Sequence, residues 1–178
     1  EGRKYEEVVL MTASLARLLR QSISNEDEVV PLAREVEYAK GYLTIQKMRY
    51  KDKLEFEIDV EPSILNIPLI KLVLQPIIEN AIYHGLKYKE SKGLLQVKGF
   101  MKDGNAILQV IDNGVGMDEE TLSHIYDKHK VNYHSNGVGV YNVQKRLKLY
   151  YGENYGITYE SEKGVGTTAT ITIPGIQE

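Results

Sequence analysis

The period of the hydrophobic pattern changes near residue 51, and this change limits the folds that the chain can adopt. Before it, apolar residues recur every three or four positions, the spacing of amphipathic helices. After it, Leu54, Phe56, Ile58 and Val60 alternate with acidic residues, which is typical of a half-buried strand. Later apolar runs and turn signals predict the order strand, helix, two strands, helix, loop, helix, two strands. We therefore predict an α+β fold: a helical hairpin followed by an α/β sandwich with a mixed sheet and helices on one face.

Two amphipathic helices are predicted in the first fifty residues. The apolar seam of the first comprises Val8, Met11, Leu15, Leu18 and Ser22. The second helix begins near Pro31, a residue that suits a first turn, and its stripe comprises Leu32, Val36, Ala39 and Leu43. Their short connection favours an antiparallel hairpin, whose thin core needs a further partner. We therefore predict two domains, 1–50 and 51–178, with a homodimer through helices 1–50; packing of both helices on the rest of the chain is the alternative.

Composition excludes several classes of function. The chain has no cysteine, which excludes disulfides and a thiolate metal site or nucleophile. A net charge of −3 gives no sign of a nucleic-acid binder or of contact with a membrane surface. No apolar run approaches the roughly 18–20 residues of a membrane span, and no signal peptide is visible. Because the chain starts at Glu1 without a methionine, we expect a piece of a longer protein.

The helix predicted for residues 68–86 carries an unusual polar run. On a helical wheel one arc collects Pro76, Glu79, Asn80, Tyr83, His84 and Lys87. The amide oxygen of Asn80 suits a hard cation, and Glu79 could accept hydrogen bonds from water around it. Tyr83, His84 and Lys87 could donate to phosphate oxygens. An ordinary solvated helix face is the alternative.

A carboxylate follows a predicted strand and precedes two glycines. Asp112 could accept a hydrogen bond from an exocyclic amine, the group that separates adenine from guanine. Gly114 and Gly116 would let the backbone turn tightly and approach a flat ring without a Cβ clash. Taken alone, this segment is also an ordinary turn.

Two more glycine-bearing segments follow. Gly137, Val138 and Gly139 precede a predicted helix, whose free N–H groups attract phosphate. Gly164 to Thr167 enters the last strand, where the hydroxyl of Thr167 could complete a base pocket through water. Each segment alone is weak evidence, but the four segments occur in one order.

This arrangement resembles the Bergerat ATP-binding fold shared by gyrase, Hsp90, MutL and the histidine kinases (GHKL). ENAIYHG resembles the N box, DNGVGM the G1 box, NGVGVYNVQKRL the G2 box and GVGTTATITIP the G3 box. The likeness runs from about Pro68 to Pro174. Three segments resemble the corresponding segments of LytS/YesM-type sensor histidine kinases: LAREVEYAKGYLTIQKMRY, the LEFEIDV that follows it, and the QPIIENAIYHG form of the N box.

The resemblance implies roles for individual residues. Asn80 would bind Mg²⁺ and Glu79 would support its shell, so that these two are the expected catalytic residues. The residues expected to bind ATP are Asn80, Tyr83, His84, Lys87, Asp112, Gly114, Gly116, Lys128, Gly137, Val138, Gly139 and Thr167. Among them Asp112 would hold the adenine amine, and Lys128 belongs to a lid expected over residues 127–136.

Two departures from the family pattern limit the expected activity. Pro76 stands where ATP-hydrolysing relatives carry a general-base Glu, so we expect no rapid hydrolysis. The phosphoacceptor histidine of the family lies on the first dimerisation helix, whereas the histidines here are His84, His124, His129 and His134. We therefore expect the chain to bind Mg·ATP without phosphorylating itself.

By the same resemblance, this chain would belong to the cytoplasmic domain of a bacterial inner- or plasma-membrane sensor. It would donate the ATP γ-phosphate to an upstream histidine for relay to an aspartate of a response-regulator receiver domain. Three alternatives stay open: a gyrase/MutL-type ATPase, a serine kinase of the anti-sigma-factor type, and a degenerate nucleotide-binding or interaction module. The predicted helical hairpin disfavours the serine kinase.

Overall fold

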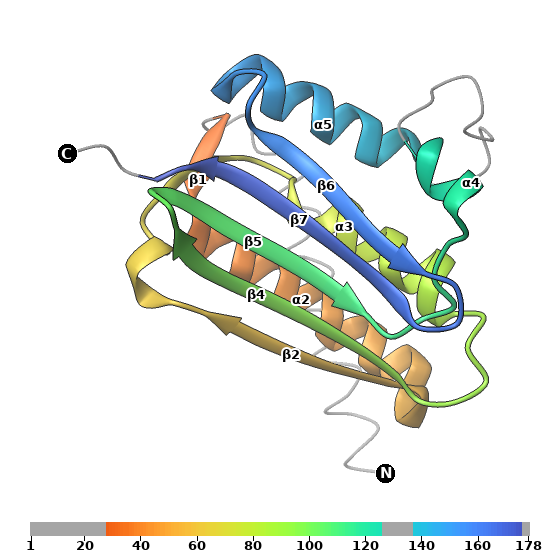
Figure 1. Ribbon diagram of the computed structural model, residues 1–178. Coiled ribbons are helices and arrows are strands. Elements are labelled where there is room, and N and C mark those ends of the chain that lie inside the picture. The colour runs from red at the N-terminus through yellow and green to blue at the C-terminus, as the bar shows by residue number, and fades with distance from the viewer. Residues whose placement is uncertain (1–27, 126–136, 176–178) are drawn as a thin grey trace, which may run out of the picture.

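A mixed five-stranded sheet forms one layer of the molecule. The computed structural model describes residues 28–125 and 137–175. The strand order is β2 (Leu54–Val60), β4 (Gly93–Lys102), β5 (Asn105–Asp112), β7 (Gly166–Pro174) and β6 (Gly156–Glu162). Strands β2 and β4 are parallel and every other neighbouring pair is antiparallel, as Figure 1 shows. The predicted α+β sandwich with a mixed sheet is confirmed.

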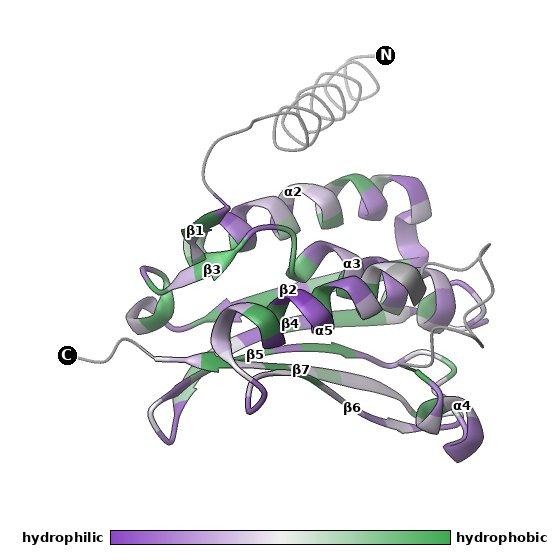
Figure 2. Ribbon diagram, turned by 90° about the horizontal axis from the view of Figure 1, so that it is seen from above, coloured by the Kyte–Doolittle hydropathy of each residue, from purple (hydrophilic) through white to green (hydrophobic). Residues whose placement is uncertain are grey.

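Helices cover one face of this sheet. They are α2 (Leu32–Tyr50), α3 (Leu74–Asn80) with its π-helical continuation η3 (Ala81–Leu86), and α5 (Gly137–Tyr151). Figure 2 shows α2, α3 and α5 on the same side of the strands. The short α4 (Glu119–Ser123) follows Asp118, whose carboxylate caps it by accepting the Thr121 N–H at 3.0 Å. The remaining elements are β1 (Val29–Pro31), β3 (Pro68–Ile70), η1 (Lys51–Lys53) and η2 (Pro62–Ile64).

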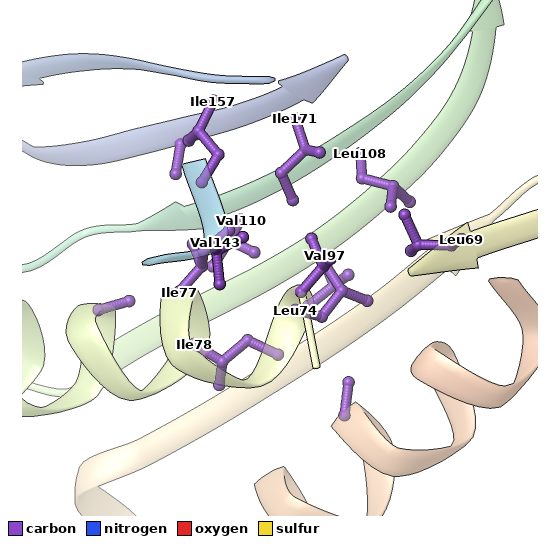
Figure 3. Close-up of a cluster of buried hydrophobic side chains, with 14 of the residues drawn as sticks. Leu69, Leu74, Ile77, Ile78, Val97, Leu108, Val110, Val143, Ile157 and Ile171 are labelled. Carbon is purple, nitrogen blue, oxygen red and sulfur yellow. The ribbon is translucent and has the colours of Figure 1, made fainter. Parts of the chain in front are cut away.

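The core lies between the helices and the sheet because alternate strand residues point inward. Figure 3 shows Ile77 and Ile78 of α3 facing Val97 of β4 and Val110 of β5. All four are at most 1% exposed. Strands β4 and β5 form a hairpin through Asp103 and Gly104, both with positive φ, as a tight two-residue turn requires.

Helix α2, the second of the two helices predicted in residues 1–50, packs on the sheet domain. Leu32 and Leu43 are fully buried and belong to the same hydrophobic cluster as Leu74 of α3 and Leu95 of β4. The core therefore continues across the boundary predicted at residue 50. The first predicted helix, with its seam from Val8 to Ser22, lies outside the described residues.

The helix predicted to begin at Pro68 begins six residues later. Residues 68–70 instead form strand β3, which pairs with β1. Leu72 then adopts a left-handed conformation with φ of 60°, and α3 starts at Leu74. The helical pattern could not show this turn, because the side chain that holds it, Glu35, is 37 positions away in the sequence. In the described part of the chain, no helix is both long and apolar enough to cross a membrane.

Candidate functional site

A hollow opens between α3–η3 and the ends of strands β5 and β7. The space between its lining atoms, open solvent included, is about 390 Å³. Its lining comprises Ile77, Asn80, Ala81, His84, Gly85, Val110, Asp112, Gly116, Met117, Tyr159, Thr167 and Ala169. We call it the α3 pocket. The structure thus brings Asn80, His84, Asp112, Gly116 and Thr167, predicted from three separate segments, to one place.

Asp112 supplies a buried carboxylate to the pocket at the end of β5. Its residue is 6% exposed, and Oδ1 accepts the Gly114 N–H at 2.8 Å. Burial raises the pKa of Asp112 to about 6, against the lowering effect of the backbone N–H groups of Gly114 and Thr167 and of the Lys89 charge. The carboxylate is therefore mainly ionised at neutral pH and can accept a hydrogen bond from a ligand.

Two glycines make room for this carboxylate. A Cβ on Gly85 would lie 2.7 Å from Asp112 Oδ1, and one on Gly114 would lie 2.4 Å from the carbonyl carbon of Gly85. Both distances are shorter than atoms tolerate. Sequence analysis predicted Gly114 but missed Gly85. A glycine inside a helical pattern is costly and often marks a close approach, and this was the available signal.

The backbone of the G1 segment crosses the β6–β7 hairpin closely. Gly116 has φ of 63°, and a Cβ there would lie 1.9 Å from the Glu162 carbonyl oxygen. Gly166, with φ of 144°, would place a Cβ 2.0 Å from the Asp112 carbonyl oxygen. Glycine is required at both positions, because no side chain fits and L residues rarely adopt this conformation.

A serine that sequence analysis missed ties these segments together. Ser161 Oγ accepts the Met117 N–H at 2.9 Å and lies 2.9 Å from the Gly166 carbonyl oxygen, to which it donates. It also lies 2.8 Å from Thr167 Oγ1. Thr167 therefore has a fixed partner at the floor of the pocket. Nothing in the sequence distinguishes Ser161, because its role depends on strand pairing.

The N-box residues divide between two sides of the helix. Asn80, the last residue of α3, and His84, in the π-helical segment, line the α3 pocket. Single π-helical turns within helices are frequent at functional sites. Burial, with a smaller effect of the Lys87 charge, lowers the pKa of His84. Its imidazole is therefore neutral at pH 7 and can donate one hydrogen bond and accept another.

Three other residues predicted on this helix and at its end, Glu79, Tyr83 and Lys87, are not among those that line the pocket. Glu79 accepts a hydrogen bond from Gln75 at 2.9 Å. Tyr83 accepts one from Arg49 of α2 at 3.5 Å, so this flank of the helix faces α2. The Lys87 ammonium lies 5.7 Å from the ring centre of Tyr88. The polar arc on the helical wheel was wide, so it included residues that face the α3 pocket and residues that face α2. Contact of these three with nucleotide stays a prediction.

The predicted phosphate-binding glycines begin helix α5 beside α3. A Cβ on Gly139 would lie 3.3 Å from Cβ of Pro76, so the start of α5 packs closely on the N-box helix. Gly137 and Val138 form the first turn of α5. Lys128 and the predicted lid over residues 127–136 lie outside the described residues. The described ranges contain no group of three or more His, Cys, Asp or Glu side chains that could hold a metal ion.

Comparisons with known proteins agree with this geometry. A model of the histidine kinase-, DNA gyrase B- and HSP90-like ATPase family matches residues 66–177, and a histidine kinase model matches residues 2–54. The chain is 31% identical over 174 residues to sensor histidine kinase YesM of Bacillus subtilis (strain 168), covering 98% of this chain and 29% of that protein. It is 34% identical over 143 residues to sensor protein LytS of Oceanobacillus iheyensis, covering 79% of this chain and 24% of LytS.

The histidine kinase domain of Erythrobacter litoralis EL346 blue-light activated histidine kinase shares the fold. Its TM-score is 0.59 at 16% identity, with 97% of this chain and 73% of that chain covered. The fold is thus that of the histidine kinase ATPase domains. The chain belongs to the histidine kinase-, DNA gyrase B- and HSP90-like ATPase family, and YesM and LytS are sensor proteins among its relatives. It spans less than a third of the length of either.

Proposed function

We propose that the α3 pocket binds Mg·ATP, with Asp112 accepting the adenine amine. The observation that supports this most is the buried Asp112 carboxylate, which faces a hollow cleared of Cβ atoms by Gly85 and Gly114. An ionised carboxylate favours an amine donor and disfavours the carbonyl oxygen that guanine carries instead. Thr167, held by Ser161, stands beside it to complete the base contact.

Asn80 is the candidate Mg²⁺ ligand. Its amide oxygen is the hard donor that this ion prefers, and it lines the same pocket as Asp112. Mg²⁺ usually keeps several waters and binds one or two protein oxygens together with substrate phosphates, so a single carboxamide fits. When bound, the ion neutralises charge on the triphosphate. His84 at the pocket edge and the N–H groups at the start of α5 are suited to the ribose and the phosphates.

We propose further that the chain is the catalytic part of a sensor histidine kinase. An imidazole nitrogen of a histidine upstream of this chain would attack the γ-phosphorus of ATP, and the bond to the ADP oxygen would break. The phosphoryl group would then pass to an aspartate of a response regulator. Asn80, Asp112 and the start of α5 would act by holding ATP in place rather than by covalent chemistry.

Rapid hydrolysis of ATP is the competing activity, and the pocket disfavours it. Activation of water needs a general base near the phosphates. Within the described residues, Asp112 is the carboxylate that lines the α3 pocket. We propose that it contacts adenine, so it would lie away from the phosphates. Pro76, at the position where hydrolysing relatives carry Glu, packs against Gly139 instead.

The parent protein would be a homodimer attached to the membrane through segments outside this chain. Helix α2 offers a surface for dimerisation, because its two faces differ. One face enters the core, whereas Tyr38, Ile45 and Met48 on the other are partly exposed and lie outside the described core cluster. These positions repeat at coiled-coil spacing. Helix α2 would therefore pair through this stripe across the dimer.

Labelling with γ-³²P-ATP tests the kinase proposal. The full-length protein should acquire acid-labile phosphohistidine, and the same protein carrying Asn80→Ala should not. Residues 1–178 alone should remain unlabelled but bind ATP. Acid-labile label on residues 1–178 alone would contradict the proposal. Hydrolysis of ATP by this chain as fast as by a hydrolysing relative would contradict it too.

A further inference from the structure

A buried carboxylate on α2 accepts hydrogen bonds from the backbone at the start of α3. Glu35 is 2% exposed, and its Oε1 accepts the Leu72 N–H at 2.8 Å. Its Oε2 accepts the N–H groups of Val73 at 2.9 Å and Leu74 at 3.1 Å. Three consecutive backbone donors therefore converge on one side chain that is 37 to 39 positions away in the sequence. Packing of α2 on the core does not by itself require this.

The backbone around Leu72 is shaped to receive an anion. Leu72 is left-handed with φ of 60°, and Val73 is right-handed with φ of −92° and ψ of −51°. Successive residues of opposite hand turn their N–H groups toward a common point, a concavity that binds anions. A leucine rarely adopts this conformation, so surrounding contacts must hold it. The Glu35 carboxylate supplies those contacts.

Opposing effects act on the charge of Glu35. Its pKa is raised, because burial outweighs the lowering effects of the three N–H groups and of the Arg146 charge on α5. An ionised carboxylate also interacts favourably with the positive end of the α3 dipole. The neutral amide of glutamine has one acceptor oxygen and no charge, and therefore cannot replace both carboxylate oxygens.

The position of Asn80 depends on how α3 begins. Leu74 and Asn80 are the first and last residues of α3, about 9 Å apart along the helix axis. Over so short a helix, a rotation at the first turn reaches the last residue. Val73, the residue before the helix, makes no side-chain cap of its own. Glu35 is thus the described side chain that fixes the helix start.

We propose that Glu35 is a positioning residue for the nucleotide site, because it sets the rotation of the helix that presents Asn80 to the α3 pocket. This inference rests on the proposed binding of Mg·ATP at that pocket. It assigns to α2 a role in binding besides packing. Asp112 belongs to the sheet and should keep its place when Glu35 is changed, so the cation contact should suffer more than the base contact.

The test compares Glu35→Gln with Glu37→Gln by calorimetric titration with ATP, with and without Mg²⁺. Glu37 lies on the same helix but is exposed and paired with Arg34 at 3.4 Å, so it is a matched control. We expect Glu35→Gln to lose roughly tenfold or more of the affinity in Mg²⁺ and less than about threefold without it. Glu37→Gln should match the wild type. Equal losses with and without Mg²⁺, or none, would overturn the proposal.

Hydrogen exchange of the nucleotide-free protein gives a readout independent of ATP. Glu35→Gln should speed exchange in residues 74–81 and leave strand β5 unchanged. Glu35→Asp, which keeps the charge on a shorter side chain, gives the same comparison where the glutamine variant fails to fold. Unchanged exchange in residues 74–81 would refute the positioning role. Absence of ATP binding by the wild type would instead refute the proposed function, so the two failures are distinguishable.

Discussion

Gly85 lies so close to Asp112 that a Cβ at position 85 would stand 2.7 Å from the carboxylate oxygen Oδ1. The N-box helix and the end of strand β5 therefore meet at a glycine and a buried acid. This contact lies at the end of the α3 pocket that we propose holds adenine, and it leads to the first prediction.

Gly85→Ala should weaken ATP binding without unfolding the protein. The added methyl group displaces the Asp112 carboxylate, and we expect the affinity to fall by roughly tenfold or more. Alanine favours helix over glycine, which offsets part of the steric cost to stability. Calorimetric titration with ATP, together with urea unfolding, measures both effects.

Gly41→Ala is the matched control for that variant. Gly41 also lies within a helix, but nothing is within 4 Å of a Cβ built there. We expect it to raise the free energy of unfolding by about 1 kcal/mol and to leave ATP affinity unchanged. Equal ATP affinities for the two alanine variants would contradict the close contact with Asp112.

The stability of Asp112→Asn should depend on pH differently from that of the wild type. The pKa of Asp112 is raised from 3.8 to about 6, so the folded protein binds this proton more tightly than the unfolded chain. The wild type is therefore favoured at low pH and loses about 3 kcal/mol as pH rises through 6. Asparagine does not titrate. The unfolding free energy of the variant relative to wild type should rise by that amount between about pH 4 and 7 in urea titrations. A difference that does not change with pH would show that Asp112 is not buried as described.

Ser161→Ala should loosen the floor of the pocket. The variant loses the hydrogen bonds to the Met117 N–H, the Gly166 carbonyl and Thr167. We expect a loss of about 1–3 kcal/mol in unfolding free energy, faster hydrogen exchange at Met117 and weaker ATP binding. Ser63→Ala is the control, because Ser63 is exposed and bonds to Glu61 at 3.3 Å. If both serine variants bound ATP like the wild type, the network would have no part in binding.

Tyr83→Phe and His84→Ala should separate the two flanks of the N-box helix. The Tyr83 hydroxyl faces Arg49 of α2, so its removal should leave ATP affinity within about twofold of wild type. His84 lines the pocket, and its removal should lower the affinity by several-fold. Titration of both variants with Mg·ATP decides the matter. A larger loss for Tyr83→Phe would place the phosphates on the α2 side.

Local patterns in the sequence predicted the sheet well. The alternation in β2 depends only on neighbouring residues, and it appears in the structure. The start of α3 was wrong because Leu72 is held in its turn by Glu35, 37 positions away. No pattern of local period contains such a contact.

The site was predictable where chemistry and backbone freedom coincide in the sequence. The sequence predicted a carboxylate at a tight turn from Asp112 and the glycines that follow it, Gly114 and Gly116. The structure places Asp112 and Gly116 at the pocket. Ser161 could not be predicted, because its partners meet only when β6 and β7 pair. The flank of Tyr83 was also hidden, because a wheel shows an arc but not the neighbour that covers it.

Calorimetric titration of wild type and Asp112→Asn with ATP and GTP in Mg²⁺ shows whether Asp112 recognises adenine. We expect the wild type to bind ATP well and GTP poorly, and the asparagine variant to lose much of its ATP affinity while it stays folded. Equal affinity of the wild type for ATP and GTP, or unaltered ATP binding by the variant, would contradict the assignment of the α3 pocket as an adenine-nucleotide site.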